Sequence, residues 1–65
     1  MKIVLNGEPR ELDAARLDKA LVELGYGEAA IATAVNGAFV PAGQRAATEL
    51  EAGDRLEVVS PRQGG

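Results

Sequence analysis

The chain has 65 residues, a formal net charge of -3, and neither cysteine nor histidine. It therefore cannot form disulfides, and it lacks the side chains that most often act as nucleophile, general base or soft metal ligand near neutral pH. Its seven basic residues are scattered, with one Phe and one Tyr, a composition that does not favour nucleic-acid binding. We expect one small domain that is not an enzyme and holds no metal or cofactor permanently.

The N-terminal segment has the period of a strand with one buried face, formed by Met1, Ile3 and Leu5. Asn6-Gly7 follows, and Asn-Gly favours a type I′ hairpin turn because both central residues need a positive φ. The returning strand is predicted at about 10–12, at a sheet edge because Pro9 has no N–H. The apolar opening is too short for a signal peptide and no run approaches membrane-spanning length, so we expect a cytoplasmic protein.

Apolar residues then recur at helical spacing: Leu17, Ala20, Leu21 and Leu24. Asp18 in the first turn complements the helix dipole, and Gly25 is placed to adopt the left-handed conformation that ends a helix. The start is less defined, because Asp13 could cap an earlier turn and Arg16 is a poor N-cap.

The pattern of the C-terminal half predicts further strands. Residues 30–35 are apolar on both faces, as in a central strand, and a second Asn-Gly turn at 36–37 leads to a short return at 39–40. Residues 44–52 are ambiguous between a short strand and a helical turn. The last strand is predicted at 55–60, and its side chains alternate: Leu56 and Val58 inward, Glu57 and Val59 outward.

This order predicts an α+β fold of the ubiquitin-like β-grasp type, a mixed sheet of four to five strands packed on one helix. The first and last strands would lie side by side and parallel in the middle of the sheet. We expect a domain at 1–60 and a flexible tail at 61–65. Carboxylates that lie close in sequence are interpreted as solvated surface groups rather than a metal or acid–base site: Glu8, Glu11, Asp13, Glu49, Glu51 and Asp54.

The terminal Gly64-Gly65 pair would let the C-terminal carboxylate enter a narrow active site, because neither glycine has a Cβ. With that tail, several blocks carry a family resemblance: Ala34-Val35-Asn36-Gly37, Val40-Pro41, Leu50, and Gly53-Asp54-Arg55-Leu56-Glu57-Val58-Val59. On these residues, along essentially its whole length, the chain resembles the ubiquitin-like sulfur carriers, and most closely the ThiS family of thiamine biosynthesis. It departs from the family at Arg45, where an aromatic residue is common, and at Arg16, where Thr is common.

The resemblance implies that the Gly65 carboxylate is adenylated by an E1-like enzyme of the ThiF type, which uses ATP and magnesium. Sulfur from a donor such as a cysteine desulfurase would convert it to a thiocarboxylate, which serves thiazole synthase of the ThiG type. Gly64, Gln63 and Arg62 would thread the partner's channel. The docking surface is expected on the sheet face opposite the helix, at Val4, Val59 and Glu57. Alternatives are a sulfur carrier for molybdopterin or cysteine synthesis, a ubiquitin-like protein modifier, and a plain interaction domain.

Overall fold

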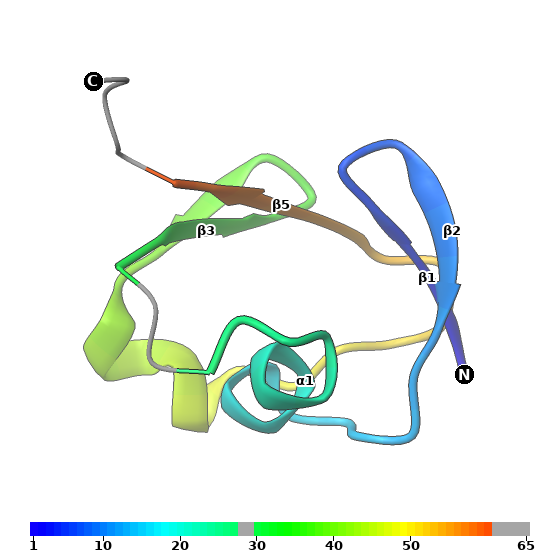
Figure 1. Cartoon of the computed structure of the whole chain (residues 1–65), viewed down its shortest axis with the longest axis horizontal. Coiled ribbons are helices and arrows are strands. Elements are labelled where there is room, and N and C mark those ends of the chain that lie inside the picture. Colours follow the sequence, from blue (N-terminus) through cyan, green and yellow to red (C-terminus); the bar gives the residue numbers. More distant parts are fainter. Residues whose placement is uncertain (28–29, 61–65) are drawn as a thin grey trace.

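The computed structural model describes residues 1–27 and 30–60, and they form a sheet that curves over one α-helix (Figure 1). The predicted tail residues Arg62, Gln63, Gly64 and Gly65 lie outside the described residues. In chain order the elements are β1 (Lys2–Leu5), β2 (Glu8–Glu11), α1 (Leu17–Glu23), β3 (Ala32–Val35), β4 (Ala38–Val40), the 3-10 helix η1 (Ala42–Ala47) and β5 (Arg55–Val59).

The sheet has the strand order β2-β1-β5-β3-β4. β1 and β5 are parallel, and the other neighbouring pairs are antiparallel. The α+β class, the mixed sheet on one helix and the parallel pairing of the first and last strands are therefore confirmed.

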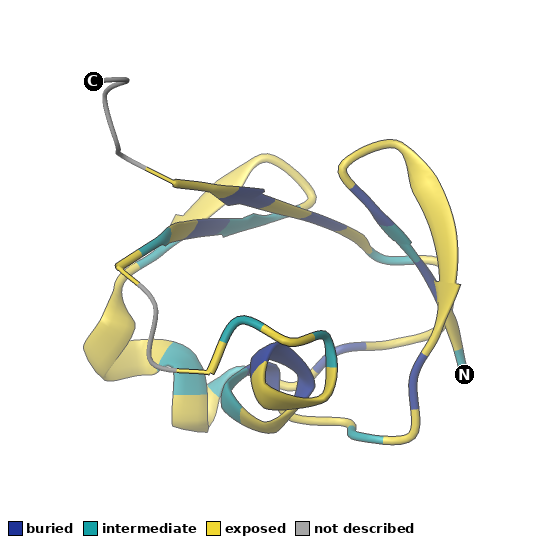
Figure 2. Cartoon of the chain, in the orientation of Figure 1, coloured by how far each residue is buried: buried dark blue, intermediate teal, exposed yellow. Residues whose placement is uncertain are grey.

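The hydrophobic core lies between α1 and the sheet face turned toward it (Figure 2). Its buried members are Ile3, Leu5, Leu12, Leu17, Ala20, Leu21, Leu50, Leu56 and Val58. The predicted helix stripe is confirmed for its first three residues, whereas Leu24 at the helix end is half-buried. The inward direction of Leu56 and Val58 is confirmed as well.

Both Asn-Gly turns have the predicted geometry. The φ angles are 50° and 87° at Asn6 and Gly7, and 52° and 86° at Asn36 and Gly37. Gly25 follows the C-cap of α1 with a φ of 96°, the left-handed conformation expected there.

The second strand begins earlier than the predicted 10–12, because β2 includes Glu8 and Pro9. Proline is tolerated there for a geometric reason. Pro9 lies opposite Val4, whose N–H donates to the Asp54 carbonyl on the other side of β1 at 2.9 Å. Val4 and Pro9 are thus a non-hydrogen-bonded pair of the β1–β2 ladder, a position that needs no N–H from Pro9.

Two other predictions need correction. The strand predicted at 30–35 begins only at Ala32, although it has a neighbouring strand on each side, as expected of a central strand. Of the two options for the ambiguous segment 44–52, the helical turn is confirmed in part: the 3-10 helix η1 occupies 42–47 and so begins and ends earlier than the predicted 46–50. An isolated bridge from Glu49 to Arg16 and the buried Leu50 follow it.

The start of α1 is held by backbone contacts from a distant segment. Arg16 is the N-cap and makes no capping side-chain bond, as expected of a poor cap. The Leu17 N–H donates instead to the Thr48 carbonyl at 2.8 Å, and the Leu50 N–H donates to the Ala15 carbonyl at 2.7 Å. The first bond satisfies the Leu17 N–H at the helix N-terminus, which the Arg16 side chain does not cap, and the second joins the same two segments.

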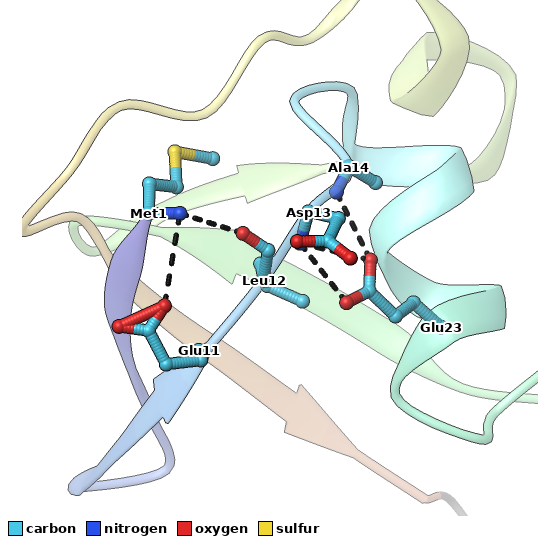
Figure 3. Close-up of polar contacts among 6 residues, drawn as sticks. All are labelled: Met1, Glu11, Leu12, Asp13, Ala14 and Glu23. Carbon is cyan, nitrogen blue, oxygen red and sulfur yellow. Dashed lines mark hydrogen bonds and ion pairs between the residues drawn. The ribbon is translucent and has the colours of Figure 1, made fainter.

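Asp13 does not cap an earlier turn; its own backbone is held by Glu23 at the end of α1 (Figure 3). The Glu23 carboxylate accepts the N–H groups of Asp13 and Ala14, each at 2.9 Å. These bonds favour the ionised form and hold the pKa of Glu23 below its ordinary value of 4.5. Next to them, the Met1 ammonium donates to the Leu12 carbonyl at 2.7 Å and pairs with Glu11 at 3.9 Å (Figure 3).

Arg45 stands where the family commonly has an aromatic residue, and it makes polar contacts. Its half-buried guanidinium donates to the carbonyl of Ile31, just before β3, at 2.8 Å and to the Thr33 hydroxyl in β3 at 3.3 Å. Thr33 is only 1% exposed, and its hydroxyl donates in turn to the Val40 carbonyl at 2.8 Å. Arg45 therefore satisfies polar groups beside the core while tying η1 to the sheet.

We predict that Arg45→Met lowers the free energy of unfolding by about 1–2 kcal/mol. Methionine has a similar length but no N–H group, so the hydrogen bonds to Ile31 and Thr33 are lost. Urea denaturation measures the change. Arg10→Met, which removes an exposed arginine from β2, is the control and should change stability by less than about 0.5 kcal/mol. Equal stability of the two variants would contradict the assigned role.

We predict that Glu23→Gln reduces the loss of stability on acidification. Because folding lowers the pKa of Glu23, its stabilising contribution is present above the ordinary value of 4.5 and is lost as pH falls through the folded-state pKa. Urea midpoints measured at neutral pH and in acid should therefore differ less in Glu23→Gln than in the unmodified chain. Glu8→Gln, at an exposed carboxylate of β2, is the control. An unchanged pH dependence in Glu23→Gln would contradict this account.

Candidate functional site

Among the described residues, no helix covers the sheet face turned away from α1, called here the outer face (Figure 1). Residues that pair directly across a ladder share a face, so the register defines its members. They are Lys2, Val4, Pro9, Glu11, Ala32, Ala34, Phe39, Arg55, Glu57 and Val59. The part of this face over β3, β4 and the C-terminal end of β5 is mainly apolar: Ala32, Ala34, Phe39 and Val59, with Glu57 beside them.

The structure brings two of the three predicted docking residues together. Glu57 and Val59 are neighbours on the outer side of β5, and Val59 is 61% exposed. Val4 is half-buried on the same face but lies opposite Arg55. Val59 lies four positions along β5 from Arg55, a distance of roughly 13 Å at about 3.3 Å per residue. Val4 is therefore at the far end of the face from Val59.

Sequence reasoning missed Phe39, which is the most exposed large apolar side chain of the sheet at 67%. It pairs with Ala34, and Ala34 pairs with Glu57, so the three residues form one row across the outer face. The turn at Asn36-Gly37 could have indicated that Phe39 and Ala34 share a face. It could not indicate which face, because residues 30–35 are apolar or small on both sides.

The charged members of the outer face have both signs: Lys2, Glu11, Arg55 and Glu57. The described part of the chain has no pocket and no group of three or more acidic side chains arranged to hold a metal ion. Within that part, no helix has the length and hydrophobicity to cross a membrane.

In this five-stranded sheet, the first and last described strands of the chain, β1 and β5, are adjacent and parallel, and the sheet packs on α1. This arrangement defines a small β-grasp protein. The sequence profile of the ThiS family matches residues 3–65, so the match continues through Gly64-Gly65. The chain belongs to the ThiS family.

Solved structures agree with this assignment. The crystal structure of the thiamine biosynthesis protein ThiS from Geobacter metallireducens is similar, with a TM-score of 0.84, 26% identity and full coverage of both chains. The solution structure of a thiamine biosynthesis protein from the same organism has a TM-score of 0.79 and 26% identity, over all of this chain and 88% of the other. Comparison with curated proteins finds no match.

Proposed function

We propose that this chain is a sulfur carrier for the thiazole ring of thiamine, and that the Gly65 carboxylate is the group that carries sulfur. The observation that supports this most is the family match through residue 65, which includes the two glycines. The similarity to a thiamine biosynthesis protein over the full length of both chains points in the same direction.

The chemistry needs activation from outside the chain, because a carboxylate is a poor electrophile. A ThiF-type E1-like enzyme transfers AMP from ATP to the Gly65 carboxylate and releases pyrophosphate, with magnesium shielding the phosphates. The terminal sulfur of a persulfide, supplied by a donor such as a cysteine desulfurase, attacks the acyl-adenylate and displaces AMP. A thiol then reduces the acyl disulfide to the thiocarboxylate, and thiazole synthase of the ThiG type accepts the sulfur.

The chain's own contribution to this reaction is binding and delivery. Gly64 and Gly65 have no Cβ and fit a narrow channel. Gln63 and Arg62, which precede them in the chain, would make backbone and charge contacts with the partner. The outer face would dock on the adenylating enzyme through Val59, Phe39 and Glu57, with Val4 at its far end. Exposed apolar side chains grouped on one face favour a protein partner.

We predict that the intact mass of the purified protein increases by the difference between sulfur and oxygen on incubation with ATP, a sulfur source and soluble extract of its host. The thiocarboxylate replaces one oxygen of Gly65, so deletion of Gly65 should abolish the increase. Mass spectrometry of the two proteins measures this.

Other results of that experiment would support other functions. Conjugates to lysines of other proteins through Gly65 would indicate a ubiquitin-like modifier. A thiocarboxylate that supports molybdopterin or cysteine synthesis, and not thiazole synthesis, would indicate a related carrier. An unchanged mass in extract with proven adenylating activity would contradict the carrier function altogether.

We predict that Val59→Ser and Phe39→Ser each lower kcat/KM for adenylation about tenfold, because each removes apolar area that docking would bury. Both side chains are exposed, so the free energy of unfolding should change by less than about 1 kcal/mol. Val22→Ser is the matched control, since Val22 lies on α1 and is 64% exposed. Docking by the outer face is wrong if Val59→Ser and Val22→Ser have the same adenylation rate.

A further inference from the structure

β5 is paired over different lengths on its two sides. On one side β3 continues along it as far as the Ala32–Val59 pair. On the other side the β1 register ends at the Leu5–Leu56 pair, and the chain then turns away at Asn6-Gly7. In the strand alternation, the N–H and C=O of Val58 point toward this second side, beyond the end of β1.

The Asn6 side chain takes the place of the missing strand. The Val58 N–H donates to Asn6 Oδ1 at 2.9 Å, and Asn6 Nδ2 donates to the Val58 carbonyl at 3.2 Å. A carboxamide presents a donor and an acceptor side by side, as a peptide group of a neighbouring strand does. The Asn6 side chain thus continues the pairing of β5 beyond the end of β1, although Asn6 and Val58 are 52 positions apart in the sequence.

Asn36 has the same place in the other hairpin but binds the opposite end of β5. Its Oδ1 accepts the Arg55 N–H at 2.9 Å, and its Nδ2 donates to the Asp54 carboxylate at 3.0 Å. Both asparagines have a φ near 50° and precede a glycine. The same substitution can therefore be made at both residues, and it removes contacts at opposite ends of β5.

We propose that Asn6 is a positioning residue for sulfur transfer, because it holds the end of β5, the last described strand before Gly65, in place. This inference rests on the proposed function. Strand ends open at little free-energy cost, so two bonds at Val58 decide whether this end is mostly closed. A fixed end of β5 raises the effective concentration of the Gly65 carboxylate in the adenylating site without changing the docking surface.

The test compares Asn6→Gly with Asn36→Gly, because glycine keeps the positive φ of both turns. Hydrogen exchange should accelerate about tenfold at the Val58 amide in Asn6→Gly, and at the Arg55 amide in Asn36→Gly. ATP–pyrophosphate exchange with the ThiF-type enzyme of the same host measures adenylation. In Asn6→Gly we expect kcat to fall about fivefold with KM within about twofold, and in Asn36→Gly no change in kcat.

A purely structural role of Asn6 gives a different result, since partial unfolding lowers the active concentration and raises apparent KM at constant kcat. That result, equal kcat losses in the two variants, or an unchanged kcat despite faster exchange at Val58 would each overturn the proposal. Failure of the unmodified chain to be adenylated would overturn the proposed function and the proposal with it. Should Asn6→Gly not fold, Asn6→Asp replaces the donor to the Val58 carbonyl with a carboxylate oxygen that repels it, and kcat should fall in this variant as well.

Discussion

The central position of β5, parallel to β1 and antiparallel to β3, is the constraint on which the rest of the molecule depends. It joins the last strand of the chain to the first and places Leu56, which is fully buried, in the middle of the core. The end of β5 is paired with β3 on one side and bound by the Asn6 side chain on the other. Under the proposed function, these contacts anchor the part of the chain that precedes the two glycines.

The alternation of β5 divides its side chains between the core and the outer face. Leu56 and Val58 contribute to the core, whereas Glu57 and Val59 on the same strand form part of the outer face. Since the folding free energy comes mainly from buried apolar area, the outer side chains are free to serve a partner at little cost to the fold. Phe39 extends the same surface across β3 to the edge strand β4.

Side chains complete the backbone hydrogen bonding of these short elements. Asn6 and Asn36 bind β5, Glu23 binds the loop before α1, and Arg45 binds the start of β3. Each acts where a regular ladder or helix stops, because strands of three to five residues leave backbone groups without partners at their ends. A domain of 65 residues buries too little apolar area to tolerate many such unpaired groups.

The sequence by itself determined the features that depend on neighbouring residues: both Asn-Gly turns, the helix stripe ended by Gly25, the alternation of 55–59 and the fold class. The family resemblance could also be read from it, because the blocks around Asn36-Gly37 and Gly53-Asp54 stand at fixed spacing from Gly64-Gly65. Only the tertiary structure decided the course of 42–50, the inward direction of Thr33 with its Arg45 partner, the exposure of Phe39, and the bond from Asn6 to Val58. Periodicity and turn preference act over a few residues, whereas these contacts join segments whose proximity exists only after the sheet has closed around β5.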